Sequence, residues 1–126
     1  MKLIIGGAWQ GKLSFALQLS GSEKSAVAEG DKDSFEKAMT SPVIHHLQEY
    51  MKRLLQEEKD PDEFIDKLME ENPDVIVILN ELGCGIVPMD PFDRVWREQT
   101  GRAGEKLAKN CNEVYRVICG IPSRIK

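Results

Sequence analysis

The segment of residues 6–12 reads GGAWQGK and matches the pattern G-x-x-x-x-G-K of a phosphate-binding loop. In such a loop, glycines let backbone N–H groups approach phosphate oxygens, the following helix N-terminus adds partial positive charge, and the lysine reaches the β- and γ-phosphates. The pattern predicts that ATP or GTP binds here and that Lys12 is a catalytic residue, stabilising the transferring phosphoryl group. The residues expected to contact the nucleotide are Gly6, Gly7, Ala8, Trp9, Gln10, Gly11 and Lys12.

The residue after this lysine departs from the pattern. Ser or Thr normally stands there and binds Mg²⁺ through its hydroxyl, whereas this chain has Leu13. Ser14 comes next, but one step along a helix turns a side chain by about 100°, so Ser14 should not replace the hydroxyl without rearrangement. Three interpretations stay open: a working loop, a loop that binds nucleotide but transfers phosphate poorly, and a glycine-rich turn without a ligand.

A second candidate segment, residues 80–88, reads NELGCGIVP and follows the most apolar run of the chain. Ligands of open α/β sheets bind beyond the carboxyl ends of the strands, so we expect Asn80 to contact the nucleotide and Glu81 to act as a catalytic residue and Mg²⁺ ligand. Arg97 and Arg102 come shortly afterwards, and their guanidinium groups are expected to clamp phosphate. The alternative is that these arginines are exposed and paired with neighbouring carboxylates.

The spacing of apolar residues predicts the elements that must position these groups. Residues 2–5 and 74–79 are continuous apolar runs, typical of parallel strands buried on both faces. Helical spacing begins directly after the glycine-rich loop. Weaker strands are expected at residues 26–28 and 114–119, with residues 121–126 as an antiparallel partner of the latter.

Three further helices are expected to begin at Ser41-Pro42, Asp60-Pro61 and Asp90-Pro91. Each pair places a side-chain acceptor at the N-cap and proline at the first helical position, where its missing N–H costs nothing. Strands that alternate with helices predict an α/β fold of the P-loop NTPase-like class. The expected architecture is a three-layer sandwich with a mostly parallel sheet of about four strands and an antiparallel C-terminal edge strand.

Length and composition restrict the class of protein further. The 126 residues suit a single domain, residues 1–126. The net charge of −4 argues against nucleic acid as the main partner, and no apolar run approaches membrane-spanning length. Without a signal-peptide core, the chain is expected to be cytoplasmic and its three cysteines to be reduced thiols. Cys84, in a glycine-rich segment, is expected to be the most accessible.

Residues 80–126, taken with the opening glycine-rich loop, resemble the bifunctional adenosylcobinamide kinase/adenosylcobinamide-phosphate guanylyltransferase family of cobalamin biosynthesis. The resemblance covers about half of the chain and is carried, in the family's order, by Asn80-Glu81, Gly83, residues 85–88, Arg94, Arg97, Gly101-Arg102, Gly120-Ile121 and Ile125-Lys126. It implies ATP- or GTP-dependent phosphorylation of a corrinoid, with guanylyl transfer, by a homo-oligomer. A catalytically reduced relative that binds nucleotide as a sensor or partner-binding module is the alternative.

The family carries a guanylylated histidine between the loop helix and the central strand, in a segment that is shorter here. His45 and His46 are the chain's two histidines, and they lack the Arg-Pro sequence that follows the family's histidine. His46 is the candidate nucleophile, and the alternative is a boundary pair beside the apolar face of the helix expected after Ser41-Pro42. A two-histidine metal site is disfavoured because adjacent helical positions point about 100° apart.

Overall fold

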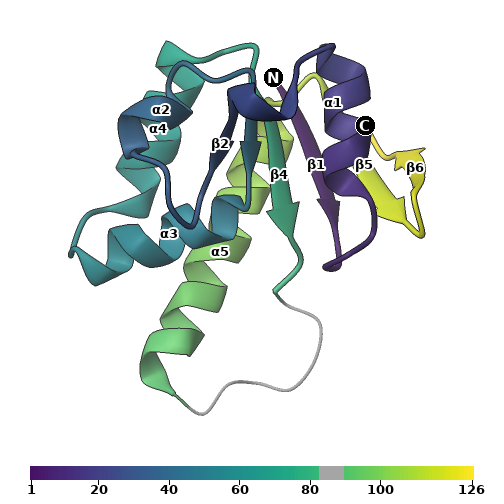
Figure 1. Cartoon of the computed structure of the whole chain (residues 1–126). Helices are drawn as coiled ribbons and strands as arrows, with labels where there is room; N and C mark the ends of the chain where they lie inside the picture. Colours follow the sequence, from purple (N-terminus) through teal and green to yellow (C-terminus); the bar gives the residue numbers. More distant parts are fainter. Residues whose placement is uncertain (83–89) are drawn as a thin grey trace.

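The computed structural model of the chain describes residues 1–82 and 90–126, and these residues form a six-stranded sheet in the order β2-β3-β4-β1-β5-β6 (Figure 1). Five strands are parallel, and β6 runs antiparallel to β5 at the edge. The strands are β1 Lys2–Gly6, β2 Val27–Glu29, β3 Val43–His45, β4 Ile76–Asn80, β5 Glu113–Ile118 and β6 Ile121–Arg124.

Helices cover both faces of this sheet. They are α1 Lys12–Ser20, α2 Phe35–Ala38, α3 Leu47–Gln56, α4 Pro61–Glu71 and α5 Pro91–Asn110, with a 3₁₀ turn at Lys24–Ala26. Successive residues of β1 face the two layers of the core: Ile4 packs with α1 on one face, and Leu3 packs with α3, α4 and α5 on the other. The expected three-layer α/β fold is thereby confirmed.

Two of the three predicted helix starts are confirmed with their caps. The Asp60 carboxylate accepts a hydrogen bond from the amide of Asp62 at 2.9 Å, and Asp90 accepts one from the amide of Phe92 at 2.8 Å. In both helices proline follows the capping aspartate in the first turn. The same local chemistry therefore starts α4 and α5.

The third predicted start, at Ser41-Pro42, is wrong. Val43 and Ile44 form β3, fully buried between β2 and β4, and the carbonyl of Pro42 accepts a hydrogen bond from the amide of Ile76 at 3.0 Å. The Ser41 hydroxyl donates to the Lys37 carbonyl at 2.8 Å instead of capping a helix. A pair of β-branched residues between two partner strands outweighs the Ser-Pro signal, and the sheet gains a fifth parallel strand.

No helix in the described part of the chain has both the length and the apolar character needed to cross a membrane. Cys111 is buried and Cys119 is exposed, both as free thiols, whereas Cys84 lies outside the described residues. Burial raises the pKa of the Cys111 thiol, so this cysteine is a poor nucleophile.

Candidate functional site

The glycine-rich loop joins β1 to α1 at the carboxyl edge of the parallel strands, where Glu29, His45 and Asn80 also end their strands. Gly6 lies at φ 154°, and a Cβ atom placed there would be 2.6 Å from the backbone oxygen of Val117. A side chain is therefore excluded where the loop leaves the sheet. Topology alone thus brings the loop to the edge where ligands of open α/β sheets bind.

Lys12 extends back beneath the loop. It is 5% exposed, and its Nζ atom donates a hydrogen bond to the backbone oxygen of Gly7. Burial lowers the pKa of Lys12, and the negative charge of Glu81 acts in the opposite direction. The amino group is therefore held inside the loop, where an incoming phosphate oxygen can replace the Gly7 carbonyl as its acceptor.

The loop borders a cavity of about 540 Å³, lined by residues 8–14, Asn80, His45 and His46 among others. Trp9 stands fully exposed at the tip of the loop with a φ of 62°. Ser14, which sequence reasoning set aside as a replacement hydroxyl, also lines this cavity. The structure therefore brings most of the predicted loop residues to one hollow, together with the histidine pair.

The loop also rests on the turn between β5 and β6, a contact that the motif did not predict. The Gln10 side-chain oxygen accepts a hydrogen bond from the Cys119 amide at 2.6 Å, and its backbone oxygen accepts one from the Gly120 amide at 2.8 Å. The Gln10 side chain, expected at the phosphates, is thus engaged in holding the loop. Nothing in the local sequence around Cys119 and Gly120 indicates this contact.

Glu81, Arg97 and Arg102 line a different cavity, of about 920 Å³, between the sheet and α5. Its floor is apolar, formed by residues such as Leu3 and Leu79. Asn80 lines both cavities, so the two hollows meet at the end of β4. The structure therefore separates these three predicted residues from the Lys12 cavity.

The ion pairs of Glu81 and Arg102 join each of them to a residue outside the expected site. Glu81 forms an ion pair with Arg116 of β5, with Oε1 and Nε 3.1 Å apart. Arg102 is exposed and pairs with Glu98 one helical turn away at 2.8 Å, which is the alternative that the sequence left open. Arg116 was missed because nothing in its local sequence distinguishes it from an ordinary exposed strand residue.

The residues at the loop do not reproduce the usual Mg²⁺ position of a phosphate-binding loop. The Leu13 side chain, where a hydroxyl would stand, packs against the core cluster that contains Ile4 and Ile78. The Glu81 carboxylate is engaged by Arg116 and lines the other cavity. The position directly after Lys12 therefore presents no oxygen ligand, and of the other two groups considered for Mg²⁺, Glu81 is paired with Arg116 while Ser14 lines the loop cavity.

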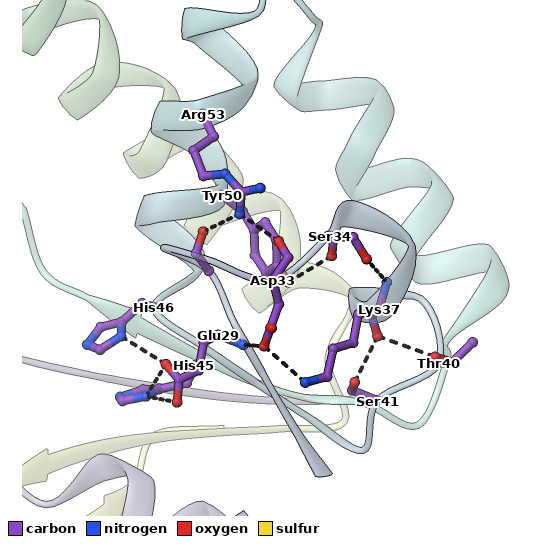
Figure 2. Close-up of polar contacts among 11 residues, drawn as sticks. Glu29, Asp33, Ser34, Lys37, Thr40, Ser41, His45, His46, Tyr50 and Arg53 are labelled. Atoms are coloured by element: carbon purple, nitrogen blue, oxygen red, sulfur yellow. Dashed lines mark hydrogen bonds and ion pairs between the residues drawn. The ribbon is translucent and has the colours of Figure 1, made fainter. Parts of the chain in front are cut away.

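The histidine pair departs most from expectation (Figure 2). His45 ends β3, and His46 is the N-cap of α3 with left-handed φ and ψ of 58° and 54°. The rings stack with centroids 3.6 Å apart and both turn Nδ1 to Glu29: His45 lies 3.0 and 3.1 Å from its two oxygens, and His46 lies 3.4 Å from one. The prediction that the two side chains diverge on a helix is wrong, because they do not lie within one.

Glu29 was not singled out by sequence reasoning, yet its carboxylate is the common partner of both imidazoles. Burial lowers the pKa of His45, while its hydrogen bond to Glu29 acts in the opposite direction. The net direction favours the neutral imidazole, which can act as a hydrogen-bond donor or as a metal ligand.

Comparison with known proteins shows which family this sequence resembles. The sequence model of the family described as cobinamide kinase / cobinamide phosphate guanyltransferase matches residues 37–125, a region that begins after the glycine-rich loop. The bifunctional adenosylcobalamin biosynthesis protein CobU of Escherichia coli (strain K12) is 35% identical over 85 residues, which cover 55% of this chain and 47% of the relative. The protein of the same name from Salmonella typhimurium (strain LT2) is 40% identical over 52 residues, covering 41% of this chain and 29% of the relative.

The chain thus spans about half or less of the length of the curated relatives that it matches. The family match covers more than half of the chain, from α2 to the C-terminal hairpin. It agrees with the resemblance seen in the NELGCGIVP segment and the residues after it. The chain therefore belongs to the cobinamide kinase / cobinamide phosphate guanyltransferase family.

Proposed function

We propose that this chain binds ATP or GTP at the glycine-rich loop and transfers a phosphoryl group to a corrinoid of the cobinamide class. The observation that carries the proposal is that two cavities adjoin at Asn80, the last residue of the parallel strand β4. The smaller cavity contains Lys12 and suits the nucleotide phosphates. The larger one has an apolar floor and suits a bulky acceptor.

In this proposal the nucleotide phosphates lie over the loop, and the Lys12 ammonium exchanges the Gly7 carbonyl for a phosphate oxygen. The acceptor lies in the larger cavity with its hydroxyl directed towards Asn80. The hydroxyl oxygen forms a bond to the γ-phosphorus as the bond between that phosphorus and the bridging oxygen breaks, so that the nucleoside diphosphate leaves and the hydroxyl proton passes to solvent. Lys12 stabilises the charge on the transferring group, and Arg97 on the wall of the larger cavity is a candidate contact for the phosphorylated product.

Calorimetric titration with ATP and with GTP, each with and without Mg²⁺, tests the binding step. Transfer of a γ-label from the nucleotide to cobinamide then tests the reaction. Binding without transfer would favour the second candidate function, a nucleotide-dependent sensor or partner-binding module. That alternative is favoured by the aliphatic side chain of Leu13 at the position of the usual metal ligand.

Replacing Leu13 with serine should make nucleotide binding more dependent on Mg²⁺ than it is in the wild type. The substitution restores a hydroxyl directly after the lysine, where phosphate-binding loops bind the metal. Nucleotide affinity and turnover, measured with and without Mg²⁺, check this result. Leu17→Ser is the control, because Leu17 packs against the same core cluster but lies one turn further along α1. A strongly Mg²⁺-dependent wild type that gains nothing from Leu13→Ser would show that another group supplies the ligand.

The chain is also expected to lack efficient guanylyltransferase activity, even if GTP binds. That reaction needs a histidine aimed at the α-phosphate and cationic groups around the charge that develops. His46 is the candidate, but the Arg-Pro sequence of the family is absent and its Nδ1 faces Glu29. Incubation with α-labelled GTP and Mg²⁺ should leave no acid-labile label on the protein. A stoichiometric adduct that is lost in His46→Ala or His45→Ala would contradict this prediction.

A further inference from the structure

Three side chains from separate points of the chain converge beside the glycine-rich loop: Glu29 from β2, His45 from β3 and His46 from the start of α3. One potential ligand atom from each lies within 4.8 Å of the other two. From these contacts we propose that Glu29, His45 and His46 bind a divalent transition-metal ion of the Zn²⁺ and Co²⁺ class.

The distances suit such an ion. The Glu29 oxygen lies 3.0 Å from Nδ1 of His45 and 3.4 Å from Nδ1 of His46. A tetrahedral ion with bonds of about 2.0–2.2 Å holds neighbouring ligand atoms about 3.3–3.6 Å apart. The two imidazole nitrogens lie within 4.8 Å of each other, so side-chain rotations that bring all three atoms to this spacing would give a coordination shell with three protein ligands and an open position. Two imidazoles and one carboxylate favour transition metals over Mg²⁺, which prefers oxygen ligands.

The backbone that carries the three ligands is fixed by its own hydrogen bonds. Glu29 and His45 are paired residues of β2 and β3, and the amide of Gly30 donates to the His45 carbonyl at 2.8 Å. On the other side, the amide of Glu29 donates to the carboxylate of Asp33 at 2.7 Å (Figure 2). The backbone of the three ligands is thus already ordered before the ion binds, which lowers the entropic cost of binding.

A hydrogen-bonded cluster without metal is the competing explanation, because Glu29 can accept an N–H from each imidazole. The placement of the cluster favours a ligand. His45 and His46 line the same cavity as Lys12 and keep 18% and 35% of their side-chain surface exposed, so an ion bound there is reachable from solvent. A pair held only for stability would gain little from that exposure.

The position of the cluster also gives the ion a task in the proposed function, on which this consequence rests. An ion held by the two histidines would place positive charge on the wall of the cavity that the loop borders, within reach of nucleotide phosphates. A phosphate-binding loop normally gains positive charge from Mg²⁺ bound by the hydroxyl after its lysine, and Leu13 has no hydroxyl. The ion at the histidines would supply positive charge in its place. Metal binding by the cluster itself does not depend on the nucleotide.

The test is titration of the chelator-treated 126-residue chain with Co²⁺ alone, monitored by visible ligand-field absorption and by calorimetry. We expect one ion per chain, and we expect His45→Ala, His46→Ala and Glu29→Gln each to weaken Co²⁺ binding by at least about 10-fold. Glu49→Gln is the matched control, since Glu49 lines the same cavity but lies outside the cluster. Its affinity should stay within about 2-fold of the wild type.

Absence of Co²⁺ binding, or equal binding by all variants, would overturn the proposal. So would a sulfur-to-cobalt charge-transfer band that disappears in Cys119→Ser, because it would place the ion on the exposed thiol. Glu29→Gln keeps a hydrogen-bond acceptor and therefore remains informative if an alanine variant unfolds. Nucleotide titrations in metal-free buffer test the loop separately, so failure of the metal site and failure of the proposed function give different results.

Discussion

Replacing Lys12 with alanine is expected to weaken binding of ATP or GTP by roughly 10-fold to 150-fold, because a charge-assisted hydrogen bond is worth about 1.5–3 kcal/mol. The Lys12 ammonium is buried beneath the loop and donates to the Gly7 carbonyl, which lies where phosphate oxygens are expected. Burial has lowered the pKa of this group, so an incoming phosphate stabilises its charged form more than water does. Calorimetric titration of the variant measures the loss directly.

Lys24→Ala is the control that separates a specific contact from general charge. Lys24 lines the same cavity, but it is exposed on the 3₁₀ turn and its charge is screened by solvent. Its removal should cost less than about 3-fold in affinity. Equal losses in both variants would mean that the cavity attracts nucleotide only through net charge. Unchanged affinity in Lys12→Ala would place the nucleotide elsewhere.

The parts of the fold that the sequence predicted correctly are those encoded by local patterns. The apolar runs that became β1 and β4 are buried on both faces, so they need no alternation to be recognised. The Asp-Pro pairs before α4 and α5 carry their own capping acceptor. In each case the decisive interactions lie within a few residues of one another.

What the sequence did not predict depends on partners far along the chain. β3 forms because Val43 and Ile44 pair with β2 on one side and β4 on the other. A Ser-Pro pair can precede a strand as well as a helix, so it does not distinguish the two. The pairs Gln10–Cys119 and Glu81–Arg116 are separated by 109 and 35 residues. Local spacing contains no information about such contacts.

The orientation of the histidine pair was predicted wrongly for a related reason. Its convergence requires His46 to adopt left-handed backbone angles, which few non-glycine residues do, and helical phase predicts the opposite orientation. Glu29 becomes the partner only through the register of β2 and β3. His46, which the sequence suggested as a nucleophile, therefore lies in a cluster with Glu29 and His45. That cluster could not be identified from the sequence because it depends on how β2 and β3 pair.

Gly30→Ala is expected to destabilise the chain by roughly 2–4 kcal/mol through overpacking and lost hydrogen bonds. A Cβ atom at Gly30 would lie 2.0 Å from the backbone oxygen of His46 and 3.2 Å from that of His45. These are backbone atoms, so no rotamer change relieves the contact. Two hydrogen bonds would also be strained. One is donated by the Gly30 amide to the His45 carbonyl, and the other is donated by the Arg53 guanidinium to the Gly30 carbonyl at 2.9 Å.

Urea unfolding followed by circular dichroism measures this loss, with Gly101→Ala as the matched control. Gly101 lies within α5, and a Cβ atom there would meet no neighbour within 4 Å among the described residues, so alanine should stabilise the chain by about 0.5–1 kcal/mol. Opposite signs for the same chemical change would show that the close approach of β2 to the His45-His46 turn is the cause. A Gly30→Ala chain as stable as the wild type would contradict it, because the histidines could then not be held as close to Glu29 as the structure places them.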